Sequence, residues 1–247
     1  MTTIEVKRDG DVCQVCFQSE KGINVFSSRV IQSLGEQVSS IAESPELRYV
    51  VFGGCRTFVA GADIKEMSAF GPQEAREFAR LGHSVFDAIE RLPQVTFAAI
   101  TGHALGGGCE LALACDFRIA TKNAKLGQPE SRLGLIPGWG GTRRLVRLVG
   151  RSQALKLMLS GEHVDADEAA RIGLIDEVVS DREELESILP RWYALMRQGS
   201  PKAIARIKRA LLGADEIDEF AACFECEDGK EGMQAFLEKR PAGWMQA

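Results

Sequence analysis

The stretch at residues 94–115 reads QVTFAAITGHALGGGCELALAC. An apolar run at residues 95–100 leads into three consecutive glycines at 106–108, and a second apolar run follows the glycines at once. A buried strand that passes through glycines into a helix presents unshielded backbone N–H groups at the positive end of that helix, where an anion is stabilised. The same helix carries a carboxylate, Glu110, in its first turn. The stretch therefore predicts an α/β fold and raises the question whether this junction holds a ligand.

Strand and helix patterns alternate on both sides of this stretch. Upstream, the apolar alternation on either side of residues 9–11 (Asp-Gly-Asp) predicts a β-hairpin, and helical spacing of apolar residues predicts a helix over residues 27–42. LRYVVFGG at 47–54 and DFRIAT at 116–121 are expected to be strands, and residues 72–92 a long amphipathic helix. These elements indicate a mixed α/β core.

Helical patterns dominate from about Gly138 onward, with LIDEVV at 174–179 as the one expected strand. The expected helices cover residues 145–148, 152–159, 166–171, 183–197, 201–212 and 215–237. We therefore expect a core at residues 1–180 and a helical region at 181–247.

Composition and charge exclude several classes of protein. The chain has 247 residues, of which 45% are hydrophobic and 26% charged, as is usual for globular domains. A formal charge of -5 and a pI near 5.4 argue against binding to nucleic acid or to an anionic membrane. No apolar run approaches the roughly 18 residues of a membrane span, and the N-terminus lacks a signal-peptide pattern. We expect a cytoplasmic protein with neither of these partners.

The cysteines and histidines give no metal-binding pattern. The seven cysteines are odd in number and lie mostly in apolar runs, which indicates free thiols in a reducing compartment. The two C-x-x-C pairs, at 13–16 and 223–226, have no histidine nearby, so packing is favoured over zinc or redox chemistry. His83, His103 and His163 are isolated and lack metal-ligand spacing. We expect no metal.

Two further segments accompany the glycine-rich junction. TFVAGADIKEM at 57–67 is a second strand-exit loop with small residues, and QPESRLGLIPGWGGTRRL at 128–145 adds a second carboxylate and another glycine-rich turn. The glycines fit neither the dinucleotide-binding spacing nor a phosphate-binding P-loop. A tight strand-to-helix junction without a ligand remains the alternative for the three glycines alone.

These three segments, in this order, resemble the crotonase (enoyl-CoA hydratase/isomerase) superfamily. The resemblance runs from the hairpin to EGMQAFLEKR at 231–240 and so covers nearly the whole chain. It implies a crotonase-type spiral of ββα units with a C-terminal α-helical trimerisation region, assembled as a homotrimer or a homohexamer. The implied activity is reversible addition of water to the 2,3 double bond of a trans-2-enoyl-CoA, giving a 3-hydroxyacyl-CoA. The partner is thus an acyl-CoA thioester, and no separate cofactor is expected because coenzyme A is part of the substrate.

The resemblance assigns the reacting groups. It places an oxyanion hole at the backbone N–H groups of Ala62 and Gly107, where two donors would stabilise the thioester enolate. It gives Glu110 the role of holding and activating water, and Glu130 that of exchanging the proton at the α-carbon. The N–H of Gly138 would further orient the water. Solvated or helix-capping glutamates are the alternative for each carboxylate by itself.

The resemblance also implies contacts with coenzyme A. It suggests that the backbone carbonyls of Ala60 and Ile64 lie against the adenine and that Lys65 and Lys21 lie near the phosphates. It also suggests that Phe236 and Lys239 reach in from a neighbouring subunit. An ordinary surface position is the alternative for each lysine.

Some positions of the chain depart from the usual pattern of this superfamily, and two rival functions remain. Ser131 stands where relatives carry a branched apolar residue and could alter the acyl pocket, and Trp139 fills the glycine-rich turn. A double-bond isomerase, or another acyl-CoA lyase of the superfamily, is the first rival; isomerases commonly lack the first glutamate, so Glu110 favours hydration. An RNA-binding relative is the second, because RIKRALL at 206–212 is a short basic helical patch.

Overall fold

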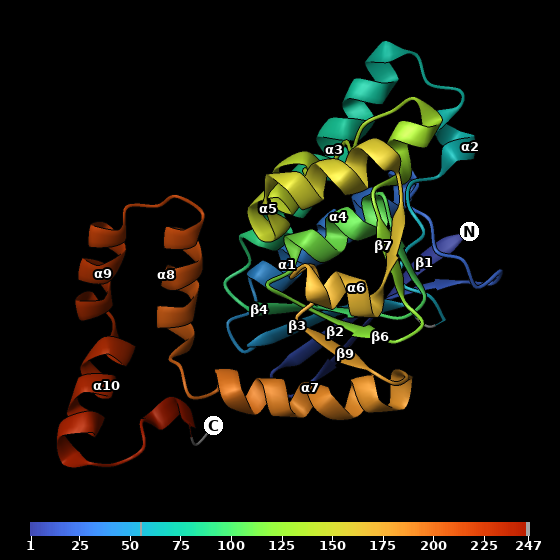
Figure 1. The fold of residues 1–247 in the computed structure, drawn as a ribbon. Coiled ribbons are helices and arrows are strands. Elements are labelled where there is room, and N and C mark those ends of the chain that lie inside the picture. The colour runs from blue at the N-terminus through green and yellow to red at the C-terminus, as the bar shows by residue number, and fades with distance from the viewer. Residues whose placement is uncertain (55, 246–247) are drawn as a thin grey trace.

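The structure is a computed structural model that describes residues 1–54 and 56–245. Within this range two sheets and the helices around them form the main body, and three helices extend away from it (Figure 1). The strands are β1 Thr2–Asp9, β2 Val12–Ser19, β3 Tyr49–Gly54, β4 Val95–Ile100, β5 His103–Leu105, β6 Phe117–Thr121, β7 Lys125–Gly127, β8 His163–Asp165 and β9 Glu177–Val179. The α-helices are α1 Ser28–Ala42, α2 Ile64–Met67, α3 Pro72–Glu90, α4 Gly107–Ala114, α5 Gly141–Ser160, α6 Ala166–Arg171, α7 Arg182–Met196, α8 Pro201–Leu211, α9 Glu216–Glu225 and α10 Glu227–Glu238. The 3₁₀ helices are η1 Pro129–Leu133 and η2 Gly243–Met245.

The larger sheet has the strand order β1-β2-β3-β4-β6-β9. β1 and β2 form the expected antiparallel hairpin, whose turn contains Gly10 in the left-handed region at a φ of 55°. From β2 onward neighbouring strands are parallel, as right-handed crossovers through helices allow. The strands expected at 47–54, 95–100, 116–121 and 174–179 are therefore confirmed.

A smaller sheet with the order β5-β7-β8 was not predicted from the sequence. Each of its strands has three residues, too few to show an alternating apolar pattern. β4 of the large sheet continues after two residues into β5 of the small one, and only Gly106 separates β5 from α4. At the glycine-rich stretch the chain therefore passes from one sheet to the other and then into a helix.

Helix α4 lies at the centre of the fold, and all eight of its residues are buried. Helices α1 and α3 pack with it over one face of the large sheet, through apolar residues such as Leu34 and Phe86. A helix with no exposed face cannot place a charged side chain in water. Glu110, on α4, must therefore be satisfied inside the protein.

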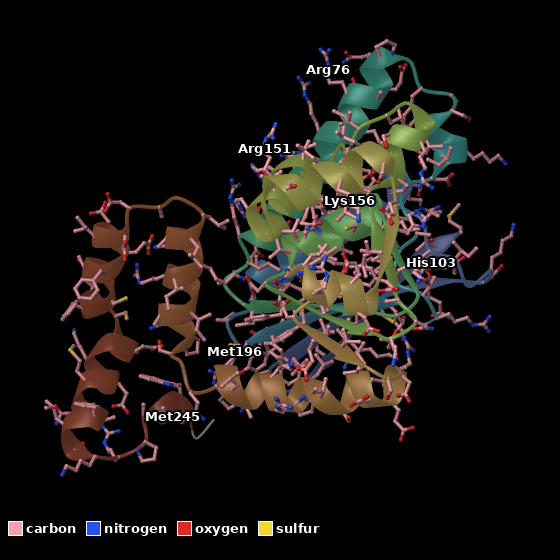
Figure 2. The ribbon with its side chains drawn as sticks, viewed as in Figure 1. Arg76, His103, Arg151, Lys156, Met196 and Met245 are labelled. Atoms are coloured by element: carbon pink, nitrogen blue, oxygen red, sulfur yellow. The ribbon has the colours of Figure 1, made fainter. Side chains whose placement is uncertain are left out.

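The opposite face of the large sheet is covered by α7. Leu185 and Leu189 of α7 are buried against the sheet, and Tyr193 stacks on Tyr49 of β3 at a ring-centroid distance of 4.6 Å. Packing on the sheet therefore continues to the end of α7, at Met196. Beyond that point α8 keeps contact with the core through Ile204 and through Lys208, which pairs with Asp116, and α9 and α10 extend farther away (Figure 2). The domain division at residue 180 stays a prediction, and the structure shows α7 packed on the core.

The helical segments after Gly138 agree with the sequence patterns in type and differ in their breaks. The segments expected at 145–148 and 152–159 both fall in α5, which leaves helical geometry at Gly150 (φ 75°). The single helix expected over 215–237 is two helices, because the chain is extended at Cys226 between α9 and α10.

The described cysteines are free thiols, and Cys55 lies outside the described residues.

Candidate active site

The three segments singled out in the sequence meet around one cavity of about 890 Å³. Its wall comes from the loop before α2, the start of α4, η1, the turn before α5 and one side of α3. Seven of the residues expected in the site lie on this wall: Ala60, Ala62, Ile64, Gly107, Glu110, Glu130 and Gly138. Their catalytic and binding roles remain predictions, but the fold brings them together from positions up to 78 residues apart (138 − 60).

The loop that carries Ala62 is extended, and its two sides are used differently. The N–H of Phe26 donates to the carbonyl of Gly61, and the N–H of Asp63 donates to the carbonyl of Phe26, both at 2.9 Å. Because successive peptide groups of an extended chain point to opposite sides, the N–H of Ala62 points away from Phe26. Gly107 is the first residue of α4, so its N–H has no acceptor within the helix. Both residues line the cavity, where these N–H groups can serve as donors to a thioester oxygen.

Close contacts explain the three consecutive glycines. A Cβ at Gly107 would lie 2.3 Å from the Trp139 ring, and one at Gly108 would lie 2.0 Å from a carbonyl oxygen of the neighbouring loop. Gly106 has a φ of 50°, and a Cβ there would lie 2.8 Å from Oε1 of Glu130. Any side chain would therefore displace the aromatic ring, the loop or the second carboxylate from the start of α4.

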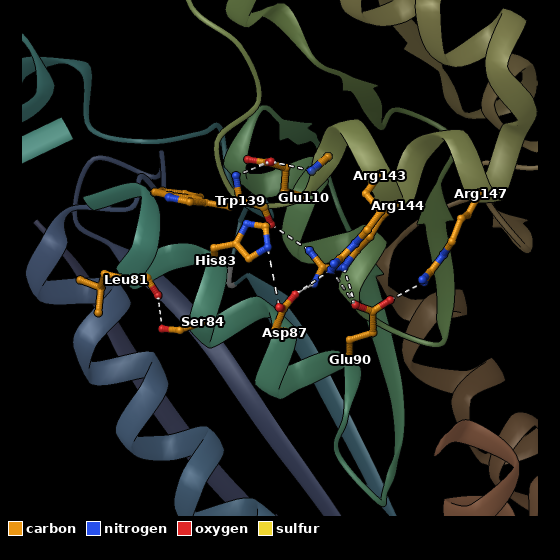
Figure 3. Close-up of polar contacts among 11 residues, drawn as sticks. Leu81, His83, Ser84, Asp87, Glu90, Glu110, Trp139, Arg143, Arg144 and Arg147 are labelled. Carbon is orange, nitrogen blue, oxygen red and sulfur yellow. Dashed lines mark hydrogen bonds and ion pairs between the residues drawn. The ribbon is translucent and has the colours of Figure 1, made fainter. Parts of the chain in front are cut away.

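Glu110 is 1% exposed and is held by the turn that precedes α5. Its Oε1 accepts hydrogen bonds from the backbone N–H groups of Trp139, at 2.7 Å, and Gly141, at 2.8 Å (Figure 3). Within the described residues no hydrogen bond reaches its other oxygen, Oε2. Since Glu110 lines the cavity, Oε2 is the oxygen left to bind a water molecule or a substrate.

Glu130 enters the cavity from η1, on the side of Gly106. The fully buried side chain of Gln128 lies beside it. With the Gln128 amide oriented so that its nitrogen faces the carboxylate, that nitrogen donates to both oxygens of Glu130, at 3.1 and 3.2 Å. The second carboxylate is thus fixed by an amide, whereas the first is fixed by backbone N–H groups.

Burial shifts both carboxyl groups toward neutrality. It raises the pKa of Glu110 to about 7, against the hydrogen bonds from Gly141 and Trp139, and the negative charge of Glu130 acts in the same direction as burial. Burial likewise raises the pKa of Glu130 to about 7. A carboxyl group with a pKa near 7 is present in both its acidic and its basic form at neutral pH. The pair can therefore supply an acid and a base to one substrate.

Sequence reasoning missed the residues that hold the two glutamates. The turn before α5 was expected to act through the N–H of Gly138, which does lie on the cavity wall, but the donors to Glu110 are Trp139 and Gly141. Gly140, between them, has a φ of 104°. The signal in the sequence was the density of glycines directly before a helix, which indicates a turn with freely directed N–H groups.

The residues expected to contact coenzyme A are only partly brought together. Ala60 and Ile64 line the cavity. Lys65 and Lys21 are exposed, in α2 and in the turn after β2, and the cavity wall does not include them. Their contact with phosphate stays a prediction.

Phe236 and Lys239 lie at the end of α10, on the helical extension that stands apart from the main body (Figure 1). Phe236 is 83% exposed. A role for these two residues in the site of a neighbouring subunit stays a prediction, and their exposure on the extension is compatible with it.

Among the described residues, the remaining polar side chains form no metal site. His83 lies on the cavity wall, with Nε2 3.7 Å from Asp87, and Ser131 donates to a carbonyl of α5 at 3.4 Å. Within residues 1–54 and 56–245 no group of three or more histidine, cysteine, aspartate or glutamate side chains could hold a metal ion. Helices long and apolar enough to cross a bilayer are likewise absent from that part of the chain.

Comparison with known proteins places this fold and site in one family. Residues 7–247 match the family model described as enoyl-CoA hydratase/isomerase, and the chain belongs to that family. It is an enzyme of the crotonase type, as the resemblance of its motifs implied.

Two curated relatives carry names that specify an activity. The chain is 43% identical to crotonyl-CoA hydratase of Syntrophomonas wolfei over 238 residues, which cover 91% of each chain. It is 38% identical to short-chain-enoyl-CoA hydratase of Clostridium acetobutylicum, with coverage of 97% and 96%.

Solved structures agree with the fold. An enoyl-CoA hydratase of Bacillus anthracis superposes with a TM-score of 0.89 at 33% identity, over 99% of both chains. Pseudomonas aeruginosa DspI gives a TM-score of 0.91 at 34% identity, over 98% of this chain and 96% of its own. The predicted crotonase-type spiral is thereby confirmed.

Proposed function

We propose that this enoyl-CoA hydratase adds water reversibly to short-chain trans-2-enoyl-CoA thioesters by the joint action of Glu110 and Glu130. One observation carries the proposal: two carboxyl groups with pKa values near 7 share a cavity with two unshielded backbone N–H donors. Hydration needs a base for the proton of water, an acid for the α-carbon and donors for the enolate oxygen. The cavity supplies all of these groups.

The steps follow from where the groups lie. The thioester oxygen is bound by the N–H groups of Ala62 and Gly107, which stabilise negative charge as the enolate forms. Glu110 holds the water through Oε2 and takes its proton as the oxygen attacks the β-carbon, and Glu130 gives a proton to the α-carbon. The water oxygen ends as the 3-hydroxyl group, and proton exchange with solvent returns Glu110 to its ionised form and Glu130 to its protonated form. Apart from water and the thioester, every reacting group comes from the chain, and we propose that no separate cofactor takes part.

A short acyl group is supported by the relatives and by the pocket. The names of both curated relatives specify crotonyl-CoA or short-chain enoyl-CoA. In this chain the indole of Trp139 fills the space next to the oxyanion glycine, in edge contact with Phe78 and Phe86 at 5.0 and 5.5 Å. The indole therefore forms a bulky, fixed part of the cavity wall beside the oxyanion glycine.

A panel of thioesters tests this proposal. The enzyme should remove the conjugated absorbance of crotonyl-CoA with a higher kcat/KM than that of enoyl-CoAs of eight or more carbons, because each misfit methylene costs of the order of 1–3 kcal/mol of transition-state binding. Saturated butyryl-CoA, which has no double bond, is the control. Equal kcat/KM across the panel would contradict the short-chain assignment, and no hydration of any member would contradict the activity.

The isomerase remains the rival within the family. It moves a proton between carbons and needs no activated water, whereas Glu110 is buried with one oxygen left free toward the cavity. A 3-enoyl-CoA substrate distinguishes the two, because isomerisation would create conjugated absorbance without net hydration. The structure favours hydration because this oxygen can hold the attacking water, which hydration needs and isomerisation does not.

The RNA-binding alternative is weakened by the pairing of its basic helix. In α8, Arg206 and Arg209 both pair with Glu219, and Lys208 pairs with Asp116 at 2.6 Å. Three cations thus share two carboxylates, which leaves one net positive charge on this patch, and the overall charge is negative. We propose a cytoplasmic enzyme with neither a nucleic-acid nor a membrane partner.

We also propose that the chain assembles into a trimer or a hexamer. Helices α8 and α9 have no buried residue, and Leu211 and Phe220 are 78% and 66% exposed. An apolar surface of this kind is covered by another subunit in a stable protein. Light scattering at micromolar concentration should give three or six times the 27.0 kDa chain mass. Phe220→Glu should lower that mass, and a monomeric wild type would overturn the expectation.

A further inference from the structure

The glycine-rich turn that holds Glu110 is itself fastened by one buried cation, Arg144 of α5. The Arg144 side chain is 1% exposed, whereas those of Arg143 and Arg147, on the same helix, are 49% and 52% exposed. A buried guanidinium is stable only when its donors are satisfied, because its desolvation costs several kcal/mol. The acceptors that Arg144 uses therefore indicate what it is there to hold.

Arg144 makes three contacts, and they join two parts of the protein (Figure 3). Its Nε donates to Oε2 of Glu90 at 2.9 Å, and its Nη2 donates to Oδ1 of Asp87 at 2.5 Å, both on α3. Its Nη1 donates to the backbone carbonyl of Trp139 at 2.8 Å. The guanidinium thus ties the turn before α5 to two carboxylates of a packed helix.

The backbone of Trp139 is bound on both sides, by Arg144 through its carbonyl oxygen and by Glu110 through its N–H. Trp139 donates its N–H to Oε1 of Glu110 and accepts from Arg144 through its carbonyl oxygen. Gly140, which follows, has a φ of 104°, and a Cβ there would lie 2.2 Å from Nη1 of Arg144. The guanidinium therefore lies directly against the glycine between the two donors to Glu110.

Only one residue of the turn is fixed by its own side chain: the Trp139 indole packs against Phe78 and Phe86 and donates to the Phe78 carbonyl at 3.2 Å. The backbone on either side of it has no side chain to hold it. Glycine is the least restricted residue of the chain, and three of the four residues from Gly138 to Gly141 are glycine. Both hydrogen bonds to Glu110 reach the same oxygen and come from this turn. The direction of Oε2 into the cavity therefore depends on where the turn is held.

We propose that Arg144 is a positioning residue for hydration: by anchoring the Trp139–Gly141 turn to Asp87 and Glu90, it sets the orientation of the Glu110 carboxylate toward the attacking water. The inference rests on the proposed role of Glu110. Arg144 is not part of the cavity wall and acts through the turn. Glu130 is held by the Gln128 amide and receives no backbone hydrogen bond from this turn, so loss of the anchor should affect it less than Glu110.

Two substitutions of Arg144 and one matched control test the proposal. Arg144→Met removes all three contacts. Arg144→Lys keeps a buried cation, but a single ammonium group cannot reproduce the planar set of guanidinium donors that reaches three acceptors at once. Arg147→Gln is the control, because Arg147 also pairs with Glu90 from α5 but makes no contact with Trp139. For each variant we would measure kcat and KM for crotonyl-CoA hydration, together with the rate of deuterium exchange into the α-carbon of butyryl-CoA.

In both Arg144 variants kcat for hydration should fall by roughly 10-fold or more, since misplacement of a catalytic group by about 1 Å can cost up to about 10²-fold. KM and the α-carbon exchange rate should stay within about threefold of wild type, because thioester binding and Glu130 are left in place. Arg147→Gln should match wild type in all three measurements. If Arg144→Met fails to fold, Arg144→Lys decides the question alone.

A near-normal kcat in the Arg144 variants that fold would overturn the proposal. An equal loss of hydration and exchange would do the same, because it would show a general structural role. A wild type that does not hydrate crotonyl-CoA or any other enoyl-CoA would instead overturn the proposed function, and the inference with it. The two failures are therefore distinguishable.

Discussion

Glu130→Gln should lose hydration and α-carbon exchange together. Glu130 is the group proposed to move the proton at the α-carbon, a step that both reactions share, and glutamine has no proton to give at neutral pH. The rate of each should fall by on the order of 10² or more, the usual contribution of a positioned acid or base. Hydration of crotonyl-CoA and deuterium exchange into butyryl-CoA are the two measurements.

Binding provides the control for this variant. Glutamine has nearly the volume of glutamate, so Glu130→Gln should still bind butyryl-CoA with close to wild-type affinity. Glu162→Gln, at an exposed carboxylate paired with Lys156 on the protein surface, is a matched substitution that should leave both rates unchanged. Retention of exchange in Glu130→Gln would mean that another group reaches the α-carbon, and the assignment of Glu130 would be withdrawn.

The parts of the fold that the sequence predicted are those with local periodic patterns. Residues 72–92 alternate apolar and polar positions at helical spacing over five turns, and α3 occupies Pro72–Glu90. The three-residue strands of the small sheet have no pattern of their own, since β7 forms only because β5 and β8 lie beside it. Pairing between distant segments is a tertiary effect that a local pattern does not contain.

The catalytic glutamates were predictable, and the residues that hold them were not. Glu110 and Glu130 were found from the order of three motifs and the resemblance that this order carries. Arg143 and Arg144, by contrast, are the same residue type at adjacent positions, and only helix packing decides which of them is buried. A charged pair at the start of a helix is normally solvated, so the anchor at Arg144 became visible only in the fold.

Glu110→Gln should separate hydration from exchange, which Glu130→Gln should not. Hydration should fall by on the order of 10² or more, because the water loses its base. Exchange should fall much less, since removal of the α-proton needs only Glu130 and the N–H donors of Ala62 and Gly107, which the substitution leaves in place. The amide oxygen of glutamine can still accept the hydrogen bonds of Trp139 and Gly141, so the turn should keep its shape.

The comparison of the two rates within one variant is what makes the test decisive. A variant that is partly unfolded, or that binds thioester poorly, would lose hydration and exchange by the same factor, whereas loss of the water-activating base alone would lower their ratio. The Arg144 variants should lower the same ratio by a smaller factor, because they displace the Glu110 carboxylate without removing it. Equal losses in Glu110→Gln would mean that the two carboxylates act as one coupled unit or that their roles are exchanged, and the positioning role of Arg144 would then have no separate step to act on.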